Sequence, residues 1–287
     1  TPPYAVFQAE EAGTIITLYE SGKVMFQGIS ADIDANMWRD MEAHLNNGKM
    51  PEEKKKKEKE KKDEKELFEE RKKYYYINSI GSDEVGTGDF FGPVVVTASY
   101  VSKDNIPFLE ELGVRDSKKL TDQKILEVVP KIIKKIPYET VIYTNTDYNN
   151  HPEYNMNKVK AILHNKAILR LMKKNNFNYD KVVIDQFCYP RNYFGYLKES
   201  SNVFRKIDFT TKAEDKCLSV ACGSLISRYV FIKEMDKISK MLGVPVPKGA
   251  GIKVDEFGKE IVKKYGKDIL KKTAKLNFKN TDKILKD

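Results

Sequence analysis

The stretch that decides the fold is residues 81–93, Gly-Ser-Asp-Glu-Val-Gly-Thr-Gly-Asp-Phe-Phe-Gly-Pro. It contains three carboxylates and four glycines, and it lies between an apolar lead-in at residues 74–80 and a β-branched run at residues 94–101. This pattern predicts a strand, a reshaped corner and a second strand. Because a regular strand sends neighbouring side chains to opposite faces, Asp83 and Glu84 can serve one site only if the backbone leaves regular pleating near residues 85–88.

The acids and glycines of this corner favour a ligand site. Neighbouring carboxylates repel each other, and a hard cation such as Mg²⁺, which prefers oxygen ligands, relieves the repulsion. An acidic, solvated turn is the simpler interpretation of an isolated Asp83–Glu84 pair. The spacing of Gly86-Thr87-Gly88 favours the ligand site, because small residues leave main-chain N–H and C=O groups free to touch a ligand.

Composition narrows the possible functions. The chain has 287 residues, 40% of them hydrophobic, so it can form one large domain or a medium and a small one. The 51 Lys and Arg residues outnumber 42 Asp and Glu, and the net charge of +9 suits a polyanionic partner. Three cysteines without a CxxC pair argue against a disulfide framework or a structural zinc site and fit a reducing cytoplasm. No apolar run is long enough to span a membrane, and three scattered histidines leave carboxylates as the better candidates for chemistry.

Residues 81–88, Gly-Ser-Asp-Glu-Val-Gly-Thr-Gly, resemble the first catalytic motif of the prokaryotic type 2 ribonucleases H. The threonine between the last two glycines resembles ribonuclease HIII, whereas ribonuclease HII usually has an arginine there. One short motif is only suggestive, so the rest of the chain must supply its partners.

The first part of the chain predicts a small separate domain. Residues 4–28 read as short strands around turns at residues 12–13 and 21–22, and a helix is expected at about residues 33–45. Residues 19–28 are similar to the N-terminal substrate-binding domain of ribonuclease HIII, which resembles half of the TATA-binding protein; a mere packing domain is an equally good interpretation. Residues 51–73 are almost wholly charged and predict a solvated linker. The expected domains are therefore 1–50 and 74–287, joined by a linker at 51–73.

Two further segments carry the remaining candidate acids. After a core-facing helix at residues 159–174, a short apolar strand at residues 181–187 contains Asp185 near its carboxyl end, which in a parallel pair opens onto the ligand crevice. Glu214 and Asp215 precede an apolar helix rich in small residues at 218–232, and both are candidates. Alignment with the family points to Glu214, the residue usual in ribonuclease HIII, but Asp215 remains a competitor. His164 is expected to be a packed or hydrogen-bonded histidine.

Other segments bear on substrate and cofactor. Residues 116–120, Asp-Ser-Lys-Lys-Leu, match the second shared motif of the family, which implies that Ser117 and Lys118 hold phosphate. Residues 247–252 are glycine-rich but lack the spacing of a phosphate-binding loop, so no nucleotide cofactor is expected. A third strand is expected near residues 138–143, and one basic helix at residues 256–273.

The family resemblance implies an α/β, RNase H-like fold, with a mixed five-stranded sheet, antiparallel first strands and flanking helices, preceded by the small α+β domain. It implies cleavage of the RNA strand of RNA/DNA hybrids, giving 5′-phosphate and 3′-hydroxyl ends. Four carboxylates can hold two Mg²⁺ ions roughly 4 Å apart, with Mn²⁺ as a substitute. The residues in this role are Asp83, Glu84, Asp185 and Glu214. Main-chain groups of Gly86, Thr87 and Gly88 would read 2′-hydroxyls.

Three alternatives remain at this point. A non-catalytic hybrid-binding protein would use the basic surface and keep vestigial acids. A DNA-directed nuclease or transposase of the same superfamily, or a ribonuclease HII-like enzyme that removes single ribonucleotides from DNA, would use the same acids. The expected protein is a cytoplasmic monomer that binds an RNA/DNA hybrid and no membrane.

Overall fold

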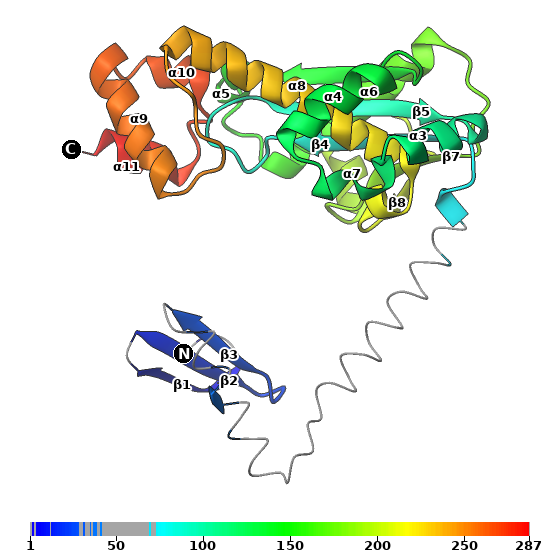
Figure 1. Ribbon diagram of the computed structural model, residues 1–287. Helices are drawn as coiled ribbons and strands as arrows, with labels where there is room; N and C mark the ends of the chain where they lie inside the picture. Colours follow the sequence, from blue (N-terminus) through cyan, green and yellow to red (C-terminus); the bar gives the residue numbers. More distant parts are fainter. Residues whose placement is uncertain are drawn as a thin grey trace. The chain divides into compact units, whose positions relative to one another are not determined.

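In the computed structural model (Figure 1), the structure describes residues 4–11, 13–28 and 73–286, with isolated positions 2, 31, 35, 37, 38, 41 and 69; the side chains of residues 11, 116, 118 and 119 are not described. The chain divides into two compact units, residues 1–66 and 67–287. The helix expected at residues 33–45 and the linker expected at 51–73 fall almost wholly outside the described residues. None of the helices described is long and apolar enough to cross a membrane.

The first unit contains a three-stranded antiparallel sheet in the order β1-β2-β3. Its strands are β1 (Ala5–Glu11), β2 (Thr14–Tyr19) and β3 (Val24–Gly28). The expected turns are present, with φ angles of 83° at Gly13 and 77° at Gly22, a region that glycine enters without steric penalty. The predicted short strands are confirmed.

The second unit is built on a mixed five-stranded sheet in the order β6-β5-β4-β7-β8. Its strands are β4 (Ser79–Val85), β5 (Val94–Val101), β6 (Tyr138–Tyr143), β7 (Lys181–Asp185) and β8 (Asp208–Thr210). The first three strands pair antiparallel, whereas β4 with β7 and β7 with β8 pair parallel. The predicted fold is confirmed. Because β4 and β7 are parallel neighbours, their carboxyl ends lie at the same edge of the sheet.

Helices cover both faces of this sheet (Figure 1). One face packs against α3 (Ile106–Glu111), α4 (Asp122–Ile132) and α8 (Leu218–Leu242), and the other against α6 (Met156–Lys174) and α7 (Pro190–Tyr196). Shorter elements are the helix α5 (Asn145–Asn149) and the 3-10 turns η1 (Lys103–Asn105), η2 (Val114–Lys119) and η3 (Ala213–Asp215). The helix predicted at residues 218–232 is present and continues to Leu242.

The C-terminal helices α9 (Ile252–Tyr265), α10 (Ile269–Thr273) and α11 (Lys279–Leu285) form a group beyond the end of the sheet (Figure 1). The single helix predicted at residues 256–273 is wrong. Gly266, with a φ of 79°, ends α9, and α10 begins three residues later. A glycine in this conformation terminates a helix because its backbone turns away from the helical path.

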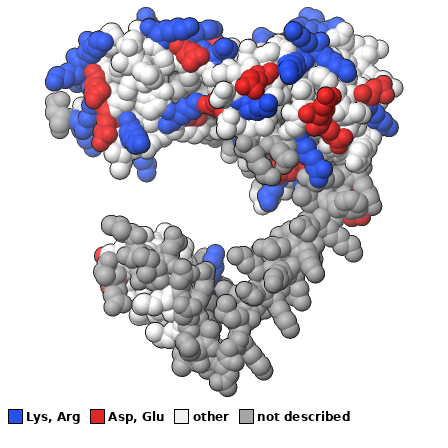
Figure 2. Space-filling view, viewed as in Figure 1, with Lys and Arg blue, Asp and Glu red and all other residues white. Residues whose placement is uncertain are grey.

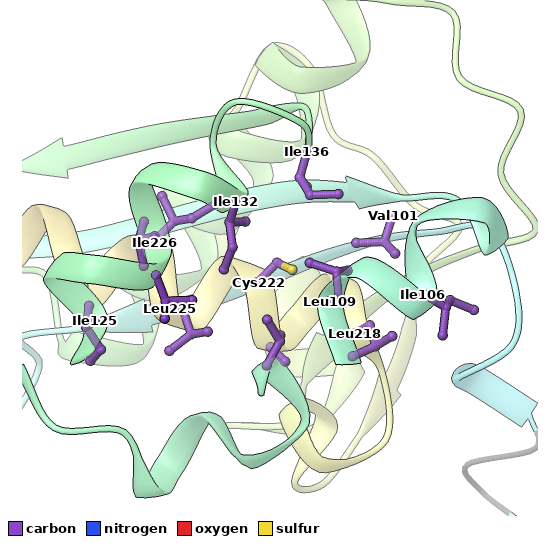
Figure 3. Close-up of a cluster of buried hydrophobic side chains, with 14 of the residues drawn as sticks. Val101, Ile106, Leu109, Ile125, Ile132, Ile136, Leu218, Cys222, Leu225 and Ile226 are labelled. Carbon is purple, nitrogen blue, oxygen red and sulfur yellow. The ribbon is translucent and has the colours of Figure 1, made fainter. Parts of the chain in front are cut away.

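Burial of α8 against the sheet organises one half of the core (Figure 3). The cluster joins α3, α4, α8 and β5 through Val101, Ile106, Leu109, Ile125, Ile132, Ile136, Leu218, Cys222, Leu225 and Ile226. The approach is close: a Cβ at Gly223 would lie 2.7 Å from the carbonyl oxygen of Thr97. The small residues at this position therefore bring α8 against β4 and β5, as the sequence predicts.

Candidate active site

Asp83 and Glu84 lie inside β4, which begins at Ser79, within the predicted lead-in at residues 74–80, and continues through both acids to Val85. Asp83 pairs with Thr97 and Glu84 with Val96 in a regular antiparallel ladder. The backbone leaves regular pleating where it was expected, since β4 ends at Val85 and Gly86 has a φ of 87°. The departure comes after Asp83 and Glu84, so their side chains still project to opposite faces of the sheet. Both acids still lie near Asp185. The last parallel pair of β4 and β7 is Ser82 with Ile184, so Asp83 and Asp185 follow it at the same edge of the sheet.

The side chain of Asp83 faces α8. Its Oδ1 accepts the main-chain N–H of Glu84 at 2.9 Å, and Ser224 of α8 forms a hydrogen bond with its carboxylate. Burial, followed by the charges of Glu84 and then Glu214, raises the pKa of Asp83 to about 8, although the two hydrogen bonds oppose the shift. A carboxyl group crowded in this way is stabilised in its charged form by a nearby cation.

The side chain of Glu84 faces α6. Its Oε2 lies 2.9 Å from Nε2 of His164, and its Oε1 forms an ion pair with Lys160. Nδ1 of His164 lies 2.7 Å from Oγ of Ser82, so the buried imidazole bridges two β4 side chains. Burial favours a higher pKa for Glu84, but the hydrogen bond and charge of His164, and then Lys160, lower it to about 2. The carboxylate is therefore ionised and held in orientation from α6.

The prediction that His164 is hydrogen-bonded is confirmed, and its partner is a candidate catalytic acid. Lys160 was missed by the sequence reasoning. The available signal was its spacing: Lys160 and His164 are four residues apart and therefore lie on one face of a helix. The sequence did not indicate that this face would meet Glu84.

Asp185 and Glu214 complete the set of acids that lie together. Asp185 ends β7, and its Oδ1 accepts the main-chain N–H of Ala213 at 2.9 Å, which ties the strand to η3. Burial, followed by the charges of Glu214 and Glu84, raises the pKa of Asp185. The charge of Glu214 thus acts on both aspartates. Glu214 and Asp215 lie in η3, ahead of α8, as the sequence predicts.

The donor set fits a divalent cation. Four carboxylates from three segments influence one another electrostatically, and oxygen donors are the ligands that Mg²⁺ and Mn²⁺ accept. As these side chains are oriented, no three Asp, Glu, His or Cys residues in the described part of the chain are grouped to bind one ion. The engagement of Glu84 with Lys160 and His164 accounts for its orientation.

The predicted substrate contacts occupy two segments. Gly86, Thr87 and Gly88 form the corner after β4, and Gly88 is exposed, with no atom within 4 Å of the position that a Cβ would take. Ser117 is buried in η2, which contacts η3. Its carbonyl oxygen accepts Nη1 of Arg228 at 3.0 Å, a contact that the sequence did not indicate. The side chain of Lys118 lies outside the description.

Comparison with known proteins gives consistent matches. Residues 80–281 match the family profile described as Ribonuclease HII, and residues 1–63 match a domain of unknown function, DUF3378. The chain is 44% identical to ribonuclease HIII of Bacillus licheniformis, over 90% of this chain and 81% of the relative. It is 41% identical to ribonuclease HIII of Listeria monocytogenes serotype 4b, over 99% and 90%. The crystal structure of Bst-RNase HIII in complex with Mn²⁺ superposes with a TM-score of 0.74 and 34% identity, covering 99% of this chain and 89% of that one.

Proposed function

The chain belongs to the ribonuclease HIII family, and on this premise we propose that it cleaves the RNA strand of RNA/DNA hybrids at the edge where β4 and β7 end, leaving 5′-phosphate and 3′-hydroxyl ends. It is a ribonuclease H, an endonuclease that hydrolyses phosphodiester bonds with divalent metal ions. The observation that carries the location is the shared edge where the parallel strands β4 and β7 end, at which Asp185 accepts the N–H of Ala213, the residue before Glu214. The charge of Glu214 raises the pKa of both Asp83 and Asp185, in agreement with this placement.

In this proposal, the residues that hold the metal ions are Asp83, Glu84, Asp185 and Glu214. Bound ions supply an activated water and stabilise charge on the leaving 3′-oxygen. The rest of the chain orients these ligands. Ser224 holds Asp83 from α8, the main-chain N–H of Ala213 holds Asp185, and the Lys160–His164 pair holds Glu84 from α6. Three of the four acids are thus each held by a different element, which supports a role for these contacts in orienting the ligands.

Selection of RNA is assigned to the corner at Gly86, Thr87 and Gly88, where main-chain groups would meet 2′-hydroxyls. Of the three residues, Gly88 is exposed, Thr87 is half-buried and Gly86 is buried. Ser117 and Lys118 are assigned to phosphate. Lys and Arg side chains are spread over the visible face of the second unit and alternate with Asp and Glu (Figure 2). A surface of this kind supports attraction of a polyanion without a single continuous basic track.

The division into residues 1–50, 51–73 and 74–287 remains part of the proposal. The two compact units and the separate match of residues 1–63 support it. We assign substrate binding to the first domain by its resemblance to the TATA-binding protein. We also propose a cytoplasmic monomer; the three free cysteines, Cys188, Cys217 and Cys222, suit a reducing compartment. Light scattering of the purified chain at micromolar concentration tests the monomer.

The deciding experiment offers the protein labelled RNA/DNA hybrid, duplex DNA and duplex RNA, each with Mg²⁺, with Mn²⁺ and with chelator. We expect metal-dependent cleavage of the RNA strand of the hybrid alone. The matched control is Asp83→Asn, which removes one charge from the proposed metal site without changing side-chain volume; it should bind the hybrid and turn over several orders of magnitude more slowly. Near-normal turnover in this variant, or cleavage of a DNA strand, contradicts the proposal.

A further inference from the structure

A fully buried lysine lies behind the corner that follows β4. Lys275 comes just after α10, and its side chain has no exposed surface. Its Nζ donates to the main-chain carbonyl oxygens of Asp89 at 2.7 Å and Gly92 at 2.5 Å. An ammonium group with no access to water is unfavourable unless its donors are used. Here two of the three donors hold one short loop, residues 89–92.

The main chain of the same loop is bonded to two C-terminal segments. On one side, Gly249 donates its N–H to Oδ1 of Asp89 at 2.6 Å and accepts the N–H of Phe90 at 2.9 Å. On the other side, the loop is bonded to residues 273–275. Gly92 donates its N–H to the carbonyl oxygen of Thr273 at 3.0 Å, and Lys275 donates its N–H to the carbonyl oxygen of Phe90 at 2.9 Å. Phe91 and Ala274 complete an antiparallel bridge. The loop is therefore held along both of its edges.

The C-terminal helices bury this loop. Phe90 and Phe91 have no exposed surface and form one apolar cluster with residues of α8, α9, α10 and α11. The ring of Phe91 meets the ring of Phe257 edge to face at 5.4 Å. Because this cluster is centred on the loop, the loop is the feature of the sheet domain that α9, α10 and α11 support.

A buried charge is a poor source of stability. Burial lowers the pKa of Lys275 to about 7, against the opposing charge of Asp89. A methionine would fill a similar volume without desolvating an ammonium group, and such replacements of buried charges are often neutral or stabilising. What the lysine adds is directional: it fixes two carbonyl groups that an apolar side chain would leave without donors.

We propose that Lys275 is a positioning residue that holds the corner at residues 86–88 in the conformation that reads substrate 2′-hydroxyls, with α9, α10 and α11 as its brace. The inference rests on the proposed function, because it assumes that this corner contacts RNA. The hydrogen bonds of the Lys275 side chain go to the loop and not to the four acids. Its effect reaches the corner through the main chain, because the loop at residues 89–92 follows directly after Gly88. Gly86, in the corner, and Gly92, at the end of the loop, both have positive φ angles.

The test measures cleavage of an unmodified and a modified substrate by the unmodified protein and by one variant. The protein change is Lys275→Met. The substrate change replaces the ribonucleotide beside the main cleavage position of an RNA/DNA hybrid by its 2′-deoxy counterpart. In the unmodified protein we expect kcat/KM to fall at least tenfold on this replacement. In the variant the fall should be less than threefold, because a displaced corner no longer distinguishes the two sugars.

The control for general destabilisation is Ile132→Val, in the core cluster of α4 and away from the loop. When its melting temperature is lowered as much as that of Lys275→Met, Ile132→Val should still show the tenfold fall of kcat/KM on the 2′-deoxy replacement. A Lys275→Met protein that also keeps the tenfold fall overturns the inference, whatever its total activity. An unmodified protein that shows no fall overturns the assignment of the corner itself.

A second variant is used if Lys275→Met does not fold by circular dichroism. Asp89→Ala removes the carboxylate that accepts the N–H of Gly249 at the surface side of the loop. It loosens the same brace without emptying a buried position, and it should also reduce the tenfold fall to less than threefold. An unchanged fall in this variant overturns the inference.

Discussion

Asp83→Asn should make the metal-free protein more stable at neutral and alkaline pH. In the folded protein, burial and then the charge of Glu84 raise the pKa of Asp83 to about 8 from an ordinary value of 3.8. Between these two values the folded state binds a proton that the unfolded state has released. Stability therefore falls as the pH rises from about 4 to about 8. Asparagine does not ionise, so the variant escapes this loss.

The size of the effect follows from the shift. One pKa unit corresponds to about 1.4 kcal/mol, so at pH 7 the loss has an upper limit of about 4 kcal/mol. Relaxation of the site and entry of water reduce such values, and we expect about 1–2 kcal/mol for Asp83→Asn at pH 7. For a protein of this size, this difference raises the melting temperature by about 3–6 °C.

Thermal unfolding in the presence of chelator, at half-unit steps from pH 5 to pH 8, measures the effect. The stability difference between Asp83→Asn and the unmodified protein should grow with pH. At pH 5 it should be less than half of its value at pH 7, because pH 5 lies about one unit above the ordinary pKa of 3.8 and pH 7 about three units above it. Asp236→Asn, at an exposed position of α8, is the control and should show no such trend. A difference that stays constant with pH, or a variant that is less stable at pH 8, would refute the electrostatic account of the site.

Four further outcomes are expected. Glu214→Gln should reduce turnover more than Asp215→Asn, since the charge of Glu214 acts on both active-site aspartates; the reverse order would reassign the fourth acid. His164→Ala should lower activity about 10- to 100-fold and weaken Mn²⁺ binding in calorimetry, because Glu84 loses its orienting partner; unchanged Mn²⁺ affinity would exclude that role. Removing residues 1–50 should raise KM and flatten its salt dependence without abolishing cleavage, as expected if phosphate contacts are lost; an unchanged KM would favour a packing role. Gel assays should show cleavage of several consecutive ribonucleotides and almost none at a lone ribonucleotide in duplex DNA, because the corner carries no cation to fix the junction; efficient nicking there would be the contrary result.

The sequence alone determined much of the catalytic framework. The β-branched run at residues 94–101 and the strand at residues 138–143 were predicted with the bounds that the structure has, because strand propensity and turn residues are local properties of the chain. The same holds for the close packing of the small-residue helix around Gly223. The acids were identified by resemblance to the family motifs, and Asp185 was also indicated by its place at the end of a short apolar strand.

Only the tertiary structure decided how those acids are held. Glu84 meets His164 across 80 residues of chain, and Asp89 meets Lys275 across 186. Neither pairing leaves a local pattern, since a lysine or histidine on a helix has the same sequence context whether it faces solvent or a carboxylate. The regular pleat of β4, which puts Asp83 and Glu84 on opposite faces, likewise depends on pairing with β5. Hydrogen bonds to distant segments, and the burial that removes competing water, set the orientation and the pKa of each acid.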